Sequence, residues 1–171
     1  MPRTVTRVAS PLGDLILEAA GSRLRAVYFP SSRHGPPPIA ESDCEEDQDR
    51  GPAGALLDRT RRQLAEYFAG TRTTFDLPLD AIGTAFQRHV WDALRSIPYG
   101  STLSYSDLAR RLGDERATRA VGAANARNPI PIIVPCHRVV GARGELTGFG
   151  GGLDRKRWLL EHEGALLPLE R

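Results

Sequence analysis

The sequence has no hydrophobic run long enough to cross a membrane, and no apolar signal segment follows its first residues. Cysteine is scarce as well, since only Cys44 and Cys136 occur among the 171 residues. This scarcity excludes a disulfide framework, and the histidines and cysteines are not spaced as ligands of a structural zinc site. We therefore expect a soluble protein of the cytoplasm that uses no metal, no organic cofactor and no membrane.

Lysine is almost absent, because only Lys156 among the 23 basic residues is a lysine and the others are arginines. Six of the 21 acids crowd between residues 41 and 49, which leaves the rest of the chain distinctly basic. Guanidinium groups suit phosphate and base-edge contacts, because they offer planar paired donors. A genomic or thermal bias toward arginine gives the same composition, so the composition alone does not decide for nucleic acid.

The first 80 residues predict an α/β domain. Three short apolar stretches separated by tight turns make residues 4–29 typical of an antiparallel sheet. The periodicity of residues 55–69 predicts a helix, and the alternation over 75–79 is that of a returning strand. A proline-rich and acidic stretch at about 30–53 predicts a mobile surface loop.

Residues 81–171 predict a mainly α domain. Thr84 and Ser104 are typical caps of two short helices, the second covering 105–112, and a further helix is expected over 116–125. Two short helices joined by Gly-Asp-Glu have the pattern of a DNA-binding helix-turn-helix. Any helical hairpin in a core has a similar pattern, so the motif alone leaves DNA binding open. A last helix is expected over 154–162.

Cys136 lies in a proline-broken stretch, residues 128–140, which predicts a buried, extended and rigid path rather than a helix or strand. A free thiol has a pKa of about 8.5 and needs a base to attack at neutral pH. The adjacent His137 is that candidate base, directly or through a water. Its partner acid is Glu163, or less plausibly Glu161 or Glu145. These residues also suit a thiol hydrolase, and a lone cysteine is often only a buried structural residue.

The stretch Pro135–Val139 resembles the active-site signature of the O6-alkylguanine-DNA alkyltransferases. Other motifs of that family occur in the same order and at similar spacing, densely from about residue 75 to 164 and loosely before. They are Gly83–Gln87, Val90–Trp91, Ile97–Gly100, Ser104–Tyr105, Arg119–Gly122, Asn128–Pro129, Gly151–Leu153 and His162–Gly164.

The resemblance implies DNA repair by direct and irreversible transfer of an alkyl group from O6 of guanine, or also O4 of thymine, to Cys136. It implies that His137 activates this thiol through a water and that Glu163 polarises the imidazole. Asn128 would tie the active-site segment to the recognition helix. Tyr105 would lie by the DNA phosphate and the leaving oxygen. Because the product is a thioether, which water does not hydrolyse, each molecule would react once.

The same resemblance implies that the target nucleotide is flipped out of double-stranded DNA, approached from the minor groove. Arg119 would fill the gap in the stack, next to small residues that let the helix come close, namely Ala120, Gly122 and Ala123. Residues expected to line the guanine pocket are Val139, Gly148, Phe149 and Trp91, although the spacing of Trp91 is also that of a core residue. We expect a monomer.

Two residues depart from the family pattern, which often has Tyr at Phe149 and sometimes Ser at Gly150. Phe149 keeps a stacking face without a hydroxyl, and Gly150 predicts a roomier pocket.

The main alternative is a catalytically silent alkyltransferase-like protein that binds lesions without repairing them. Such proteins lack the acceptor cysteine, which Cys136 supplies here. A methyl-sensing regulator would carry a further zinc domain, and a thiol hydrolase leaves Arg119 and Asn128 unexplained.

Overall fold

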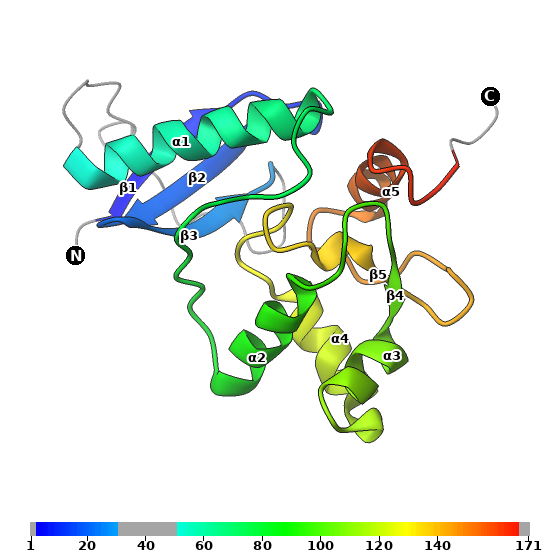
Figure 1. The fold of residues 1–171 in the computed structure, drawn as a ribbon. Helices are drawn as coiled ribbons and strands as arrows, with labels where there is room; N and C mark the ends of the chain where they lie inside the picture. Colours follow the sequence, from blue (N-terminus) through cyan, green and yellow to red (C-terminus); the bar gives the residue numbers. More distant parts are fainter. Residues whose placement is uncertain (1–2, 31–50, 168–171) are drawn as a thin grey trace. The chain divides into compact units, whose positions relative to one another are not determined.

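The computed structural model describes residues 3–30 and 51–167, in two compact units, Met1–Ile82 and Gly83–Arg171 (Figure 1). The first unit contains three strands, β1 (Arg3–Val8), β2 (Leu15–Ala20) and β3 (Arg23–Tyr28), and the helix α1 (Gly51–Phe68). The predicted mobile loop lies almost wholly outside the described residues.

The strands form an antiparallel meander in the order β1-β2-β3, and α1 crosses one face of it (Figure 1). Alternate residues of β2 and β3 and one stripe of α1 are buried between the two layers. The largest of these are Leu15, Leu17, Leu24, Leu57, Leu64 and Tyr67. The predicted α/β fold of the first unit is confirmed.

The helix begins at Gly51, so the expectation that residues 51–53 belong to a loop was wrong. Pro52 occupies the first turn, where a backbone N–H has no helical partner and proline therefore costs nothing. Gly51 has a φ of 59°, a left-handed conformation that suits a glycine at the first position of the helix.

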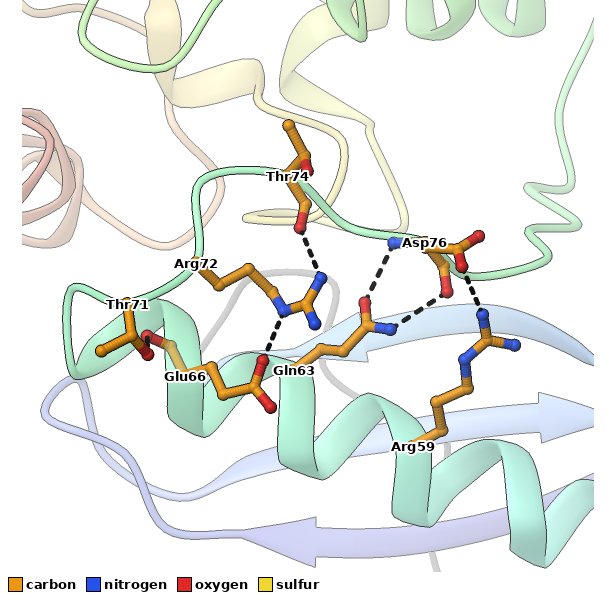
Figure 2. A network of polar contacts seen from close by, with 7 residues as sticks. All are labelled: Arg59, Gln63, Glu66, Thr71, Arg72, Thr74 and Asp76. Atoms are coloured by element: carbon orange, nitrogen blue, oxygen red, sulfur yellow. Dashed lines mark hydrogen bonds and ion pairs between the residues drawn. The ribbon is translucent and has the colours of Figure 1, made fainter.

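The stretch 75–79 forms only one bridge to the sheet, between Leu79 and Leu24, instead of the predicted strand. The amide of Gln63 on α1 takes the place of a neighbouring strand (Figure 2). It donates to the Asp76 carbonyl at 3.1 Å and accepts from the Asp76 N–H at 3.0 Å. An ion pair between Arg72 and Glu66, 2.8 Å long, holds the start of the same segment on α1 (Figure 2).

The second unit is mainly helical. Its helices are α2 (Ala85–Leu94), α3 (Tyr105–Arg111), α4 (Thr118–Ala126) and α5 (Leu153–His162). Thr84 and Ser104 cap α2 and α3 as predicted, each accepting a hydrogen bond from a backbone N–H of the first turn. Asp114 starts a short 3-10 turn before α4, so the predicted single helix over 116–125 is divided there.

The segment before Cys136 is buried, as predicted, but it is not extended. The N–H of Val134 donates to the Ile130 carbonyl at 2.9 Å, and Ile132 between them has a φ of 72°. A β-branched residue rarely adopts this left-handed conformation, so the surrounding packing imposes it. Two short strands, β4 (Leu103–Ser104) and β5 (Val139–Val140), then pair in parallel and join this segment to the start of α3.

Candidate active site

Cys136 begins a 3-10 turn, Cys136–Arg138, at the end of the buried segment and is 4% exposed. Burial raises the pKa of this thiol to about 11, although a hydrogen bond from Asn128 and the charge of Lys156 oppose the rise. The thiol is therefore protonated at neutral pH. It needs a base before it can act as a nucleophile.

Asn128 fastens the turn that carries Cys136. Its Nδ2 donates to the Val134 carbonyl at 2.8 Å, and its Oδ1 accepts from the Ile130 N–H at 3.0 Å. Both ends of the amide are used within one loop, directly after α4. This position fits the predicted link between the active-site segment and the helix.

His137 and Glu163 form a buried pair in which Nε2 of the imidazole lies 2.7 Å from Oε1 of the carboxylate, and neither side chain is exposed. Burial by itself would raise the pKa of Glu163, but hydrogen bonds from His137 and Arg138 lower it to about 2. Burial lowers the pKa of His137, so the imidazole is neutral at pH 7. A carboxylate only accepts hydrogen bonds, so the imidazole proton is on Nε2.

This tautomer leaves Nδ1 of His137 as the basic atom of the site. Nδ1 is buried, and within the described part of the chain it has no hydrogen-bond partner. Of the three acids that the sequence left open, the structure pairs Glu163 with His137. Glu161 faces Arg157 at 3.9 Å, and Glu145 accepts from the Arg143 N–H at 2.8 Å.

Tyr105 and Lys156 form a second polar group, in which Tyr105 was expected and Lys156 was not. The Tyr105 hydroxyl donates to the Thr147 carbonyl at 2.7 Å. Lys156 is fully buried, and its Nζ lies 2.6 Å from the carbonyls of Val139 and Thr147 and 3.4 Å from the Tyr105 hydroxyl. Burial lowers the pKa of Lys156 to about 8 and raises that of Tyr105. The sequence signal that could have pointed to Lys156 is that it is the only lysine of an arginine-rich chain.

Two further residues were missed by the sequence analysis. Arg138 is 6% exposed and binds Glu163 with two parallel hydrogen bonds, described below. Asn125 on α4 is 1% exposed and donates from Nδ2 to the Cys136 carbonyl at 3.3 Å. In the sequence, Arg138 is marked only as a member of the Pro135–Val139 motif, and Asn125 only by its place between two motifs.

The residues predicted to contact DNA lie on α4, except Tyr105, which begins α3. Arg119, Ala120 and Ala123 are exposed, and a Cβ added at Gly122 would be in ordinary contact with the Tyr105 ring, at 3.7 Å. The small residues thus leave the surface of α4 open beside Tyr105.

The residues predicted to line the guanine pocket differ in exposure. Val139 is fully buried and Phe149 is half-buried. Gly148 is exposed, and a Cβ added there would lie 3.2 Å from the Tyr105 hydroxyl. Trp91 is 3% exposed, and its indole donates to the Ala124 carbonyl at 2.8 Å, which joins α2 to α4. That contact is typical of a core residue, so the place of Trp91 in a pocket stays a prediction.

Across residues 3–30 and 51–167, no three His, Cys, Asp or Glu side chains come together as a metal site. None of the helices described is long and apolar enough to span a bilayer.

Two family models match the chain. The ribonuclease-like domain of 6-O-methylguanine DNA methyltransferase matches residues 5–81, and the DNA binding domain of the same enzyme matches residues 85–165. Methylated-DNA–protein-cysteine methyltransferase of Mycobacterium bovis is 47% identical over 169 residues, 95% of this chain and 93% of that protein. The protein of the same name from Salmonella typhimurium is 46% identical over 167 residues, 94% of this chain and 95% of its own length.

Solved structures give the same result. A crystal structure of Mycobacterium tuberculosis OGT in complex with DNA has a TM-score of 0.79 and 44% identity, and the match covers 95% of this chain and 93% of that one. A structure of an O6-methylguanine DNA methyltransferase from Methanococcus jannaschii has a TM-score of 0.64 and 28% identity, over 96% of both chains.

Proposed function

Because the chain belongs to the 6-O-methylguanine DNA methyltransferase family, we propose that it repairs duplex DNA by moving the alkyl group of O6-alkylguanine irreversibly to its own Cys136. The enzyme class is that of its relatives, a DNA–protein-cysteine methyltransferase. The observation that carries the assignment of the acceptor is the buried Cys136-His137 turn with Glu163 2.7 Å from the imidazole.

The transfer begins with a proton. His137 Nδ1 takes the Cys136 proton through one water molecule, because the proton on Nε2 is already committed to Glu163. The sulfur then attacks the alkyl carbon in line with the C–O6 bond, so that an S–C bond forms as the C–O6 bond breaks. The bond electrons stay on the guanine, which must take up a proton to leave neutral.

Tyr105 is suited to supply that proton. Its raised pKa keeps the hydroxyl protonated, and Lys156 Nζ lies 3.4 Å away to replace the proton that is given up. Asn128 holds the loop of Cys136 in place, so the sulfur does not have to be positioned by the substrate. The product is a thioether on Cys136, which nothing in this site can cleave, and each molecule therefore reacts once.

We further propose that α4 contacts the DNA from the minor groove. Extruding a base costs a few kcal/mol of unstacking, and the exposed Arg119 fills the gap while its charge faces the phosphates. The exposed small residues Ala120 and Ala123 permit a close approach to the groove. The pocket assigned to Val139, Gly148 and Phe149, activity on O4-alkylthymine, the monomeric state and a place in the cytoplasm remain predictions.

The experiment is the intact mass of the protein after incubation with a duplex carrying one O6-methylguanine. We expect a gain of one methylene group, at most one per protein, that peptide mapping places on Cys136. Unmodified duplex and Cys136→Ser should give no gain, and Cys44 serves as an internal control for unselective alkylation. Tight binding to the lesion without a mass gain would refute the transferase and favour the lesion-binding alternative.

A further inference from the structure

Arg138 binds the carboxylate of Glu163, the partner of His137, at both of its oxygens. Its Nε donates to Oε2 of Glu163 at 2.8 Å and its Nη2 donates to Oε1 at 2.9 Å, which is the parallel two-bond geometry of a guanidinium–carboxylate pair. Its Nη1 donates to the Ile97 carbonyl at 2.7 Å, and its guanidinium lies 5.7 Å from the centre of the Tyr99 ring. The side chain is therefore fixed at three points.

This arrangement determines how Glu163 can bind His137. Oε2 is occupied by Arg138, and Oε1 accepts from both Arg138 and His137. The guanidinium thus sets the plane of the carboxylate whose Oε1 accepts the imidazole proton. Because Arg138 follows His137 directly in the chain, the same 3-10 turn carries the nucleophile, the base and the group that orients the acid.

We propose that Arg138 is a positioning residue for alkyl transfer, which holds Glu163 ionised and oriented so that His137 keeps its proton on Nε2 and presents Nδ1 as the base. This inference rests on the proposed roles of Cys136, His137 and Glu163. Arg138 itself does not touch the reacting atoms. Its effect is on the protonation of the imidazole and on the direction in which the lone pair of Nδ1 points.

The charges around His137 give the sign of the effect. Glu163 raises the pKa of the imidazole, whereas Arg138, from the same turn, and Lys156, from α5, lower it. The side chains that α2 buries, Val90, Trp91 and Leu94, carry no charge. Removing the guanidinium therefore raises the pKa of His137 and that of Glu163. The imidazole then becomes protonated at a higher pH than in the wild type, and the protonated form cannot act as a base.

The test uses the full-length variants Arg138→Met and Arg138→Lys. The first removes the charge and both hydrogen bonds, and the second keeps the charge but not the parallel pair. Arg62→Met, an exposed arginine on α1, is the matched control for the loss of one charge. Single-turnover methyl transfer from O6-methylguanine duplex is measured from pH 5 to 8, together with duplex affinity and the nitrogen NMR shifts of His137, assigned by comparison with His137→Gln.

For Arg138→Met we expect the rate at pH 7 to fall about ten- to a hundredfold, as for the loss of a buried charged hydrogen bond. The acid limb of its pH profile should move to higher pH, and His137 should show a mixture of tautomers with unchanged duplex affinity. Arg138→Lys should restore the position of the acid limb and only part of the rate. Arg62→Met should behave as the wild type.

A folded Arg138→Met protein with the wild-type pH profile and a pure Nε2–H tautomer would overturn the inference. If Arg138→Met does not fold, Arg138→Lys decides: a full wild-type rate would refute the need for the parallel hydrogen bonds. A wild type that transfers no methyl group would refute the proposed function instead, so the two failures are distinguishable.

Discussion

Replacing Glu163 with glutamine should destabilise the protein in a way that depends on pH. A glutamine keeps the size of the side chain but removes the charge between His137 and Arg138, and its amide nitrogen cannot accept a hydrogen bond from either. Removing one member of a buried ion pair typically costs about 3–5 kcal/mol, because the other charge is left uncompensated. We therefore expect Glu163→Gln to be among the most damaging substitutions in the second unit.

The pKa of Glu163 gives an independent magnitude. A depression from 4.5 to about 2 corresponds to about 3 kcal/mol of native-state stability. The pKa is lower in the folded state, so this contribution is complete above about pH 4.5 and disappears as the pH falls toward 2. The difference in unfolding free energy between wild type and Glu163→Gln should thus be about 3 kcal/mol at pH 7 and shrink steadily below pH 4.5.

Urea unfolding from pH 3 to pH 7, followed by tryptophan fluorescence, measures this difference. Glu161→Gln on the same helix is the control, since its partner Arg157 lies 3.9 Å away and both side chains are partly exposed. An exposed pair of this kind contributes about 0–1 kcal/mol, so the control should stay close to the wild type. A difference for Glu163→Gln that is the same at pH 3 and pH 7 would refute the assignment of Glu163 as a buried, stabilised carboxylate.

Three other substitutions test separate parts of the site. Arg119→Ala should slow transfer from duplex DNA but leave the reaction with free O6-alkylguanine base unchanged, since the exposed arginine acts only on DNA; equal slowing of both reactions would contradict its role. The wild-type rate should decline above about pH 8, because Lys156 loses its proton there. In a stopped-flow pH series, Lys156→Met should react slowly and should not show this decline at high pH. Trp91→Phe should lower the unfolding free energy by about 1 kcal/mol, because the hydrogen bond to Ala124 is lost, and its transfer rate should stay near that of the wild type. A large loss of transfer rate without a loss of stability would instead support a place for Trp91 in the guanine pocket.

The sequence predicted the parts of the fold that depend on local patterns. The strands of residues 3–28 follow from alternation and tight turns, and the capping of α2 and α3 follows from Thr84 and Ser104. The family, the fold class and the enzyme class were also predicted and are confirmed. The strand expected at 75–79 does not form, because the side chain of Gln63, 13 residues earlier in the chain, makes the backbone hydrogen bonds of Asp76 that a neighbouring strand would make.

The site was less accessible to prediction wherever its geometry depends on burial. The left-handed Ile132 cannot be read from a residue type that normally avoids that conformation. The sequence already favoured Glu163 over Glu161 as the partner of His137, and the structure gives the contact itself, 2.7 Å between Nε2 and Oε1. In the sequence Lys156 looks like a surface cation and Arg138 has no role beyond its place in the Pro135–Val139 motif, and the fold shows that both are buried and hydrogen-bonded.

The resting charges of the site suit a protein that can react only once. Cys136 is a thiol, His137 is neutral, and the opposite charges of Glu163 and Arg138 lie within hydrogen-bond distance of one another. A permanent thiolate would react with any oxidant or electrophile that reached it, and each such event would consume the whole molecule. Burial keeps Cys136 protonated and so limits such reactions, and in the proposed mechanism Nδ1 of His137 takes up the thiol proton during transfer.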